Sequence, residues 1–303
     1  MKAIVTGADG FIGSSVTREL LAHGCEVLAV DRSPNPRRLN LKLPGLIYRQ
    51  CDCEQIESLI PEFGNKYDVF YHFAWAGPSG DDRKDFRLQL ANVGVFLNII
   101  VSASKLGCKK IVFASSIIEL EANALAYTNG ASPDSHYIYG GAKASCRLMG
   151  KPLADSLGID LVWANIASVY GVGDRSGGFI NSTLTKILKK EELDFTKGEQ
   201  CCDFVYIDDV AAAFRLLGLY GKANCAYLIG SGYPCSVRDY VLQILNTLSV
   251  SDEPHFGTVP FSGFPWQASM FSIADIVKDC QYTPKVSFAE GVKKTFKWLQ
   301  SQN

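Results

Sequence analysis

The sequence predicts an α/β protein with a Rossmann-like doubly wound parallel sheet and a smaller C-terminal substrate-binding lobe. Apolar, strand-like runs alternate with amphipathic, helix-like segments over the first half of the 303 residues. The first run, Ala3–Val5, leads directly into glycines at the spacing G-x-x-G-x-x-G. Repeated βα units form one parallel sheet with right-handed crossovers. We therefore expect a Rossmann domain over residues 1–165 and mainly the substrate lobe over 166–303, with segments of the lobe returning to the core.

The glycine turn and the strand after it predict a dinucleotide site. A turn at the first glycine reverses the chain, a side chain at the second would keep a pyrophosphate from the backbone, and the third lets the helix pack close to the strand. The free N–H groups at the start of that helix then face the phosphates. The second strand, 27–30, ends on an acid that can accept hydrogen bonds from a ribose. The residues expected at this cofactor are Gly7, Gly10, Phe11, Ile12, Gly13, Asp31 and Arg32. An ordinary βαβ turn is the alternative.

The acid at the end of the second strand favours NAD over NADP. A 2′-phosphate would meet the like charge of Asp31 at close range. The next residue, Arg32, would have to fold over the adenine to bind that phosphate, and Arg37-Arg38 lies on a loop from which it could reach a cofactor phosphate. NADP stays the alternative cofactor.

The remaining elements of the first half follow in chain order. Strands are expected at 46–48, 67–73, 110–114 and 159–164, a short crossover at 54–63, and helices at 84–106 and from Tyr137 to about Leu157. A loop that includes Pro133 is expected between Ser115-Ser116 and the second of these helices. The near-continuous apolar run at 67–73 is typical of a parallel strand buried on both faces.

The second half shows a looser pattern. A glycine-rich loop is expected at 170–178, strands at 203–207 and 226–229, an irregular stretch at 256–270, and a closing helix at 288–299. Asp208-Asp209 is expected to cap a helix that ends near Leu219, and Ser236 to cap the next one.

Composition narrows the class of protein. Hydrophobic residues make up 47%, charged residues 20%, and the formal net charge is −1. This balance argues against a general nucleic-acid or membrane surface. No uninterrupted apolar run has the length of a membrane span, and the first strand begins at residue 3, so we expect no signal peptide and a cytoplasmic protein. The ten cysteines are scattered without a C-x-x-C pair, which favours free thiols over disulfides or a metal site.

A tyrosine and a lysine supply candidate acid–base chemistry. Tyr139 and Lys143 are four residues apart on an expected helix and share one face. A lysine ammonium beside a phenol favours the phenolate and lowers its pKa, which suits a general acid or base. Ser115 and Ser116 end a strand, where a hydroxyl could hold a substrate oxygen. Tyr137 is a rival without a lysine four residues on, and His72 is expected to be a packed histidine.

Together these motifs resemble the extended short-chain dehydrogenase/reductases of the NAD-dependent epimerase/dehydratase group. The matching segments span nearly the whole chain: Thr6–Gly13, Asp31, Asp52, His72–Gly77, Asn92, Ser115-Ser116, Tyr139–Lys143, Val169–Gly171 and Asp203–Val210. The resemblance implies a bound nicotinamide cofactor and mostly nucleotide-linked sugar substrates. It implies catalytic roles for Tyr139, Lys143 and Ser116, and a structural role for Asn92. It also implies cofactor contacts from Asp52, Cys53, Phe73, Ala74, Trp75, Ser115, Tyr139 and Lys143, and substrate contacts from Trp75, Ser116, Ser168 and Phe179.

Departures from the family pattern bear on the substrate and the reaction. Ile117 and Ile118 stand where the 4,6-dehydratases carry an acidic pair, so we exclude dehydration, which needs an acid to protonate the leaving hydroxyl. Cys202 stands where an arginine usually holds the substrate's phosphates, the stretch 261–266 lacks the second such arginine, and Ser168 replaces an asparagine. The sequence offers three substitutes for the arginines, which are Arg175, Lys186 and Arg238.

The leading hypothesis is an NAD(P)-dependent epimerase or oxidoreductase acting on a carbon of a nucleotide sugar. A one-way nucleotide-sugar 4-keto reductase is the first alternative, and a non-catalytic NAD(P)-binding sensor or scaffold the second. The resemblance also suggests a homodimer formed through the two long helices, 84–106 and 139–157. Asp208-Asp209 is expected to be a helix cap and not a metal site, and no metal is expected.

Overall fold

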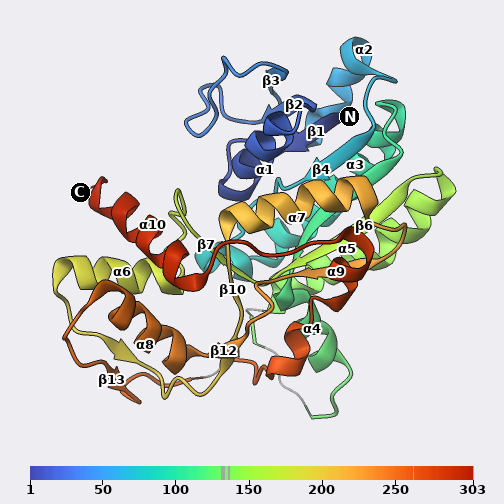
Figure 1. Cartoon of the computed structure of the whole chain (residues 1–303). Helices are drawn as coiled ribbons and strands as arrows, with labels where there is room; N and C mark the ends of the chain where they lie inside the picture. The colour runs from blue at the N-terminus through green and yellow to red at the C-terminus, as the bar shows by residue number, and fades with distance from the viewer. Residues whose placement is uncertain (131–133, 136, 262, 303) are drawn as a thin grey trace. The chain divides into compact units, whose positions relative to one another are not determined.

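The computed structural model describes residues 1–130, 134–135, 137–261 and 263–302 (Figure 1). It divides the chain into two compact units. The first unit comprises Met1–Ile166, Ala211–Tyr227 and Ile276–Tyr282. The second comprises Ala167–Val210, Leu228–Asp275 and Thr283–Asn303.

The strands follow the alternation expected from the sequence. They are β1 (Lys2–Thr6), β2 (Glu26–Asp31), β3 (Leu46–Gln50), β4 (Val69–His72), β5 (Lys110–Ser116), β6 (Asp160–Ile166), β7 (Ser168–Tyr170), β8 (Asp194–Phe195), β9 (Cys201–Cys202), β10 (Phe204–Tyr206), β11 (Ala226–Ile229), β12 (Cys235–Ser236) and β13 (His255–Phe256).

The helices connect these strands. They are α1 (Phe11–Ala22), η1 (Cys53–Leu59), α2 (Ile60–Phe63), η2 (Gly80–Lys84), α3 (Phe86–Lys105), α4 (Ile117–Ala126), α5 (Tyr137–Ser156), α6 (Phe179–Lys189), α7 (Ile207–Tyr220), α8 (Val237–Leu248), η3 (Ala268–Phe271), α9 (Ala274–Cys280) and α10 (Phe288–Gln300), where η marks a 3-10 helix.

The first unit is built on the predicted doubly wound sheet. Within the described part of the chain, seven strands form one sheet in the order β11-β6-β5-β4-β1-β2-β3. β1 pairs in parallel with both β2 and β4, and β5 pairs in parallel with both β4 and β6. The strand order reverses between β1 and β4, and ligands of such sheets bind beyond the carboxyl ends of the strands at this point.

Helices cover the two faces of this sheet, and alternate residues of β4 show which helices lie where. Tyr71 points to α7, where its hydroxyl occupies the space beside Gly218, and Phe73 packs on Phe214 with ring centroids 4.6 Å apart. His72 points to the other face and stacks on Phe96 of α3. Figure 1 shows α1 and α7 on the first of these faces and α3 and α5 on the other. Because helices bury both faces of the sheet here, the apolar run at 67–73 is nearly continuous and does not alternate.

Three local features differ from the sequence prediction. Residues after Ser116 form helix α4 and not a loop, because the Ser116 hydroxyl accepts a hydrogen bond from the Ile118 N–H and caps the helix. The expected loop position at Pro133 lies outside the described residues. The helix expected from residue 84 begins at Phe86, because the Asp85 side chain caps it.

The third difference concerns Asp208-Asp209, which does not precede its helix. Both acids lie inside the first turn of α7. The Asp209 carboxylate instead accepts hydrogen bonds from the backbone N–H groups of Lys285 and Val286, at 2.8 and 3.0 Å. The cap predicted at Ser236 is confirmed, since its hydroxyl and Asp239 form a capping box at the start of α8.

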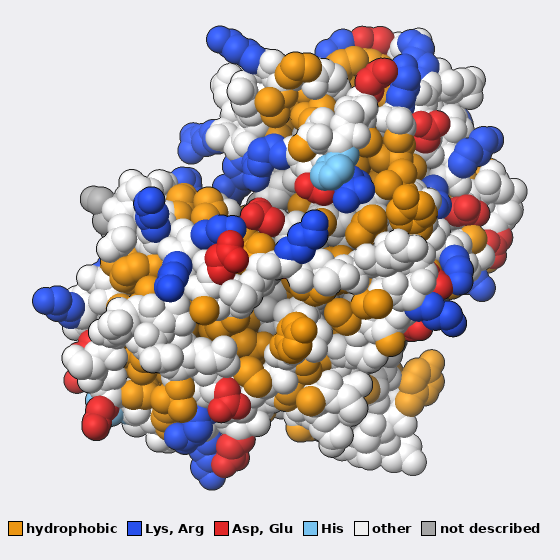
Figure 2. All heavy atoms as spheres, in the orientation of Figure 1, with side chains coloured by type: hydrophobic (Ala, Val, Ile, Leu, Met, Phe, Trp, Pro, Cys, Tyr) orange, Lys and Arg blue, Asp and Glu red, His pale blue; other side chains and the backbone are white. Residues whose placement is uncertain are grey.

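Helix α3 is long and apolar enough to span a membrane by length and composition. In this structure it packs along α5 and the sheet, with Phe96, Ile99, Ile100 and Ala103 fully buried in the core. The polar side chains of Gln89 and Asn92 on the same helix bind the chain that follows β4. Packing in the first unit therefore accounts for the apolar composition of α3. Figure 2 shows acidic and basic side chains interspersed on one face of the molecule, as the net charge of −1 leads one to expect.

Candidate active site

The glycine turn has the tight geometry that a dinucleotide site requires. Gly7 has a φ of +65°, and a Cβ there would lie 2.7 Å from the Ala74 nitrogen. A Cβ on Gly13 would lie 2.1 Å from the Gly7 oxygen. Gly10 is the N-cap of α1 and gives the first N–H groups no side-chain partner. The start of α1 is thus an open backbone cradle beside β1, which fits a pyrophosphate.

Asp31 ends β2 and is held in place by the backbone. Its Oδ2 accepts a hydrogen bond from the Asp9 N–H and its Oδ1 accepts one from the Ser33 N–H, both at 3.0 Å. A carboxylate fixed at this strand end can still accept a ribose hydroxyl through its remaining lone pairs. Arg32 is exposed beside it. The backbone N–H of Arg37 donates a hydrogen bond to the Asp9 carboxylate at 2.9 Å, which holds the loop that carries Arg37.

The residues implied at the adenine and along the cofactor are divided between the ends of β3 and β4. Asp52 is exposed and caps η1 by accepting the Glu54 N–H. Burial raises the pKa of the neighbouring Cys53 thiol to about 12, so the thiol is neutral near pH 7. Phe73 and Ala74 follow β4 and are half-buried, Ala74 being the residue that closes on Gly7.

The three residues with implied catalytic roles meet in the first unit. Ser116 ends β5 next to Ser115, while Tyr139 and Lys143 lie one turn apart on α5. Tyr139 is 7% exposed and Lys143 4%. The Lys143 Nζ donates to the Ala114 carbonyl at 2.9 Å and lies 3.5 Å above the centroid of the Trp75 ring.

The charge beside the tyrosine comes from a residue that the sequence did not indicate. Burial raises the pKa of Tyr139 to about 12, while Arg83 and a hydrogen bond with Ser116 lower it. The Arg83 guanidinium lies 4.7 Å from the centroid of the Tyr139 ring, whereas the Lys143 Nζ is 5.6 Å away and bonds to Ala114. The expectation that Lys143 lowers the pKa of this phenol is therefore wrong, because the cation that lowers it is Arg83.

Lys143 occupies an apolar setting that disfavours its charge. Trp75, Phe113 and Tyr139 surround its ammonium. Burial, together with a smaller effect of Arg83, lowers the pKa of Lys143 to about 7. The charge of this lysine near neutral pH is therefore sensitive to the charges around it.

Two polar residues of α3 fix the chain that follows β4. The Gln89 side chain is fully buried, accepts from Trp75 Nε1 at 2.8 Å and donates to the carbonyl groups of Gly77 and Asp82. The Asn92 side chain accepts the Ala76 N–H at 3.0 Å and donates to the Ala76 carbonyl at 2.9 Å. These bonds agree with the structural role implied for Asn92.

The same loop positions Arg83. Its Nε donates to the Pro78 carbonyl at 2.5 Å, and in the part of the chain that the structure describes its terminal nitrogens have no hydrogen-bond partner. A polar residue, Gln89, within an apolar helix is the sequence feature that could have indicated the hydrogen bonds to the chain after β4. No sequence feature indicates the role of Arg83, since a charged side chain in a loop is ordinarily solvated.

His72 is a packed histidine, as expected. Its Nδ1 lies 2.7 Å from the Thr6 hydroxyl, and burial lowers its pKa to about 3. The rival Tyr137 is half-buried at the start of α5, where burial raises its pKa.

The other predicted substrate residues belong to the second unit. Ser168 begins β7 and is half-buried. Phe179 begins α6 and packs its ring on Phe204 and Phe195. The three candidate phosphate ligands are engaged within that unit: Arg175 donates to Gln302, Lys186 to the Glu192 carbonyl, and Arg238 to the Lys197 carbonyl while its guanidinium covers Phe256.

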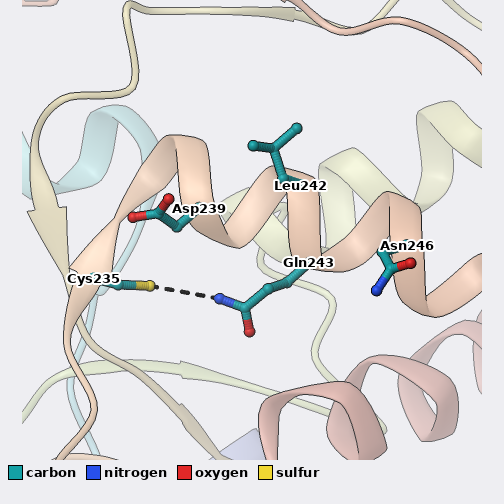
Figure 3. A pocket seen from close by; sticks show the side chains of 5 residues that line it. All are labelled: Cys235, Asp239, Leu242, Gln243 and Asn246. Carbon is teal, nitrogen blue, oxygen red and sulfur yellow. Dashed lines mark hydrogen bonds between the residues drawn. The ribbon is translucent and has the colours of Figure 1, made fainter.

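A surface depression in the second unit lies along α8 (Figure 3). It is lined by Cys235, Asp239, Leu242, Gln243 and Asn246. The Gln243 amide points toward Cys235 and donates to its sulfur at 3.8 Å. None of the predicted site residues line this depression, and none of the ten cysteines, all of which lie in the described ranges, forms a disulfide.

Comparison with known proteins places this site in a family. A model of the NAD-dependent epimerase/dehydratase family matches residues 3–230. A UDP-glucose 4-epimerase of Mycolicibacterium smegmatis is 26% identical over 328 aligned positions, covering 100% of both chains. A dTDP-4-dehydro-6-deoxy-D-allose reductase of Streptomyces bikiniensis is 27% identical over 259 positions, covering 74% of this chain and 75% of the relative.

A solved structure shows the same fold over the full length. The UDP-glucose 4-epimerase of Thermotoga maritima, determined with UDP-glucose, superposes with a TM-score of 0.82 at 25% identity and covers 100% of this chain and 99% of its own. The family is NAD-dependent, and the glycine cradle with the fixed carboxylate of Asp31 fits that cofactor. The chain belongs to the NAD-dependent epimerase/dehydratase family.

Proposed function

We propose that this protein is an NAD-dependent epimerase that inverts a hydroxyl-bearing carbon, carbon 4, of a nucleotide sugar. The observation that carries the proposal is the convergence of Tyr139, Ser116 and Lys143 at the carboxyl end of β5, in the same unit as the glycine cradle. The epimerases among the relatives and solved structures support carbon 4 and a UDP-linked sugar.

The residues have distinct roles in this proposal. Ser116 holds the sugar oxygen by a hydrogen bond, and Tyr139, which bonds to Ser116, removes or returns the proton of that oxygen. Lys143, which donates to the Ala114 carbonyl in this structure, would hold the cofactor ribose. Bound NAD would supply the hydride acceptor and donor for the sugar carbon.

A one-way 4-keto reductase is the second candidate, and the state of Tyr139 favours it. With a pKa of about 12 the phenol is protonated near pH 7, which prepares it to donate a proton to a ketone oxygen. An epimerase must also run the opposite transfer, which needs a further cation beside the phenol. The reductase among the relatives supports this alternative.

We propose further that the protein is not a 4,6-dehydratase. Ile117 and Ile118 occupy the positions after Ser116 that carry acids in those enzymes. The next acid, Glu119, is fully buried and its Oε2 binds Ser115 and Trp163. That geometry directs its carboxylate into the protein core.

The experiment incubates purified protein with UDP-hexoses, UDP-uronic acids and their 4-keto derivatives. Product is followed by NMR and reduced cofactor by absorbance at 340 nm. An epimerase forms a C4 epimer with no net change in absorbance, and a reductase consumes reduced cofactor. Loss of water from the sugar with release of a 4-keto-6-deoxy product would refute the exclusion of dehydration.

Tyr139→Phe tests the proposed acid–base residue, and Tyr137→Phe is the matched control. We expect turnover to fall by about 10²–10⁴-fold, the usual contribution of a general acid–base group, with the Kd for NAD unchanged. Tyr137→Phe should retain turnover. If Tyr139→Phe were fully active, the proposed role of Tyr139 would be wrong. Tight NAD binding without turnover of any sugar would favour the sensor or scaffold.

A further inference from the structure

Glu119 is a buried acid that the proposed reaction does not use. Its side chain is 0% exposed, and its Oε2 accepts hydrogen bonds from Ser115 Oγ and from Trp163 Nε1, the latter at 2.5 Å. Within the described chain its Oε1 has no hydrogen-bond partner, and it lies 3.7 Å from Arg147 Nη1. A buried carboxylate is costly unless it is paired, so its presence calls for a physical explanation.

Several elements bring this carboxylate behind the catalytic residues. Ser116 caps α4, which places Glu119 in the first turn, where the helix dipole favours an acid. α4 packs closely on α5, since a Cβ on Gly140 would lie 2.4 Å from the Ile118 oxygen. Trp163 comes from β6 and Arg147 from α5, one turn beyond Lys143.

We propose that Glu119 is a positioning residue of the active site: its buried negative charge, held by Ser115, Trp163 and Arg147, keeps the ammonium of Lys143 charged in an otherwise apolar pocket. Glu119 does this without contact with substrate or cofactor. The role rests on the proposed function only in that a charged lysine serves cofactor binding and turnover.

The charges around Lys143 identify Glu119 as the group that can act in this way. Burial lowers the pKa of Lys143 most, Arg83 of η2 lowers it further, and Cys146 and Glu119 raise it. Burial raises the pKa of Cys146 to about 12, so its thiol is neutral near pH 7 and carries no charge to offer.

The remaining groups near Lys143 do not replace the charge of Glu119. His72 of β4 is neutral, because burial lowers its pKa to about 3, and Tyr139 is neutral at pH 7 with a pKa of about 12. Arg147 is positive and pairs with Glu119, which reduces the effect of that acid on Lys143. In this set Glu119 is the carboxylate, and it raises the pKa of Lys143.

The test titrates Lys143 directly and needs no substrate. Protein labelled with ¹³C at the lysine ε-carbon is titrated by NMR between pH 5.5 and 9, and Lys143→Met identifies the signal. Glu119→Gln, which keeps the size of the side chain and loses its charge, should lower the midpoint from about 7 by about one unit, the size of an ordinary perturbation in a folded protein. Glu119→Asp, which keeps the charge, should leave the midpoint nearer to wild type.

A second variant, in which the midpoint of Lys143 should shift in the opposite direction, separates the proposed effect from a general loss of stability. Arg147→Gln removes the cation that pairs with Glu119 and should raise the midpoint of Lys143. If Glu119→Gln did not fold, this upward shift would still test the proposal. An unchanged or raised midpoint in folded Glu119→Gln, or an unchanged or lowered one in Arg147→Gln, would overturn it.

Turnover distinguishes this proposal from the proposed function. If wild type converts a nucleotide sugar, the pH optimum of Glu119→Gln should shift to lower pH, where Lys143 is charged again. A uniform loss at every pH with an unshifted profile would indicate a merely structural role and overturn the proposal. If no sugar reacts, the proposed function fails while the NMR midpoints still decide the role of Glu119.

Discussion

The buried ammonium of Lys143 makes the stability of the ligand-free protein depend on pH in a predictable direction. Its pKa is lowered from 10.5 to about 7 by burial. A pKa below that of the unfolded chain means that the unfolded state binds more protons between these two values. The free energy of unfolding therefore rises with pH across this window. Lys143→Met, which keeps the apolar stem and removes the charge, abolishes this dependence.

The magnitude follows from the size of the shift. A difference of 10.5 minus about 7 is about 3.5 units, and at about 1.36 kcal/mol per unit the charged lysine costs the folded state about 5 kcal/mol at pH values well below 7. Between pH 6 and pH 8.5 about 2 kcal/mol of this cost is relieved. Wild type should thus gain about 2 kcal/mol relative to Lys143→Met over that interval.

The assay is urea unfolding of both cofactor-free proteins at pH 6, 7, 8 and 8.5, followed by tryptophan fluorescence. Other titrating groups, such as His72 with its pKa near 3, are present in both proteins and cancel in the difference. Lys109→Met serves as the control, because this lysine is exposed, and its difference from wild type should not vary with pH. A difference between wild type and Lys143→Met that stays constant, or that falls as pH rises, would refute the buried-charge interpretation.

Three further predictions follow from the geometry. Gly13→Ala should weaken NAD binding and lower the free energy of unfolding, because its Cβ would lie 2.1 Å from a backbone oxygen. Gly94→Ala, on an open part of α3, should instead stabilise the protein by up to about 1 kcal/mol. If calorimetry gave the same NAD affinity and the same melting temperature for both variants, this prediction would be wrong. Native protein should bind NADH several-fold more tightly than NADPH, and Asp31→Ala should narrow or reverse that preference in titration calorimetry; a native preference for NADPH would show that the carboxylate does not select the cofactor. We propose that α3 and α5 pair across a twofold axis in a homodimer, so that Leu148→Glu, at a site 74% exposed in the single chain, should yield monomers in light scattering; a monomeric wild type would refute it.

Local rules predicted the backbone of the first unit well. The strand runs, the glycine turn and the acid at the end of β2 are features of contiguous sequence, and each is found at the expected place. The sequence does not predict helix α4, because its first four residues, Ile117-Ile118-Glu119-Leu120, contain a single polar residue and show no amphipathic period. The Ser116 hydroxyl, for which the sequence predicts a chemical role, both bonds to Tyr139 and caps this helix.

The electrostatics of the site could not be read from spacing. A spacing of four residues predicts that Tyr139 and Lys143 share one face of a helix. Both lie on α5, one turn apart, as this spacing predicts. Their mutual influence, however, depends on where the ammonium finds an acceptor, and the nearest one is the Ala114 carbonyl on β5. Sequence separation gives no sign of that contact, because it arises where α5 packs on the sheet beside β5.

The same reasoning explains why the charges that act on the proposed catalytic pair, Tyr139 and Lys143, come from segments without a motif. Arg83 reaches Tyr139 because Gln89 and Asn92 tie the chain after β4 to α3. Glu119 is held behind Ser115 because Trp163 and α5 close around it. The motif residues are the groups proposed to react, while their pKa values depend on burial and on the charges that tertiary packing brings close to them. Chains that share the tyrosine and lysine but differ at positions 83 and 119 should therefore differ in pH optimum while keeping the same catalytic groups.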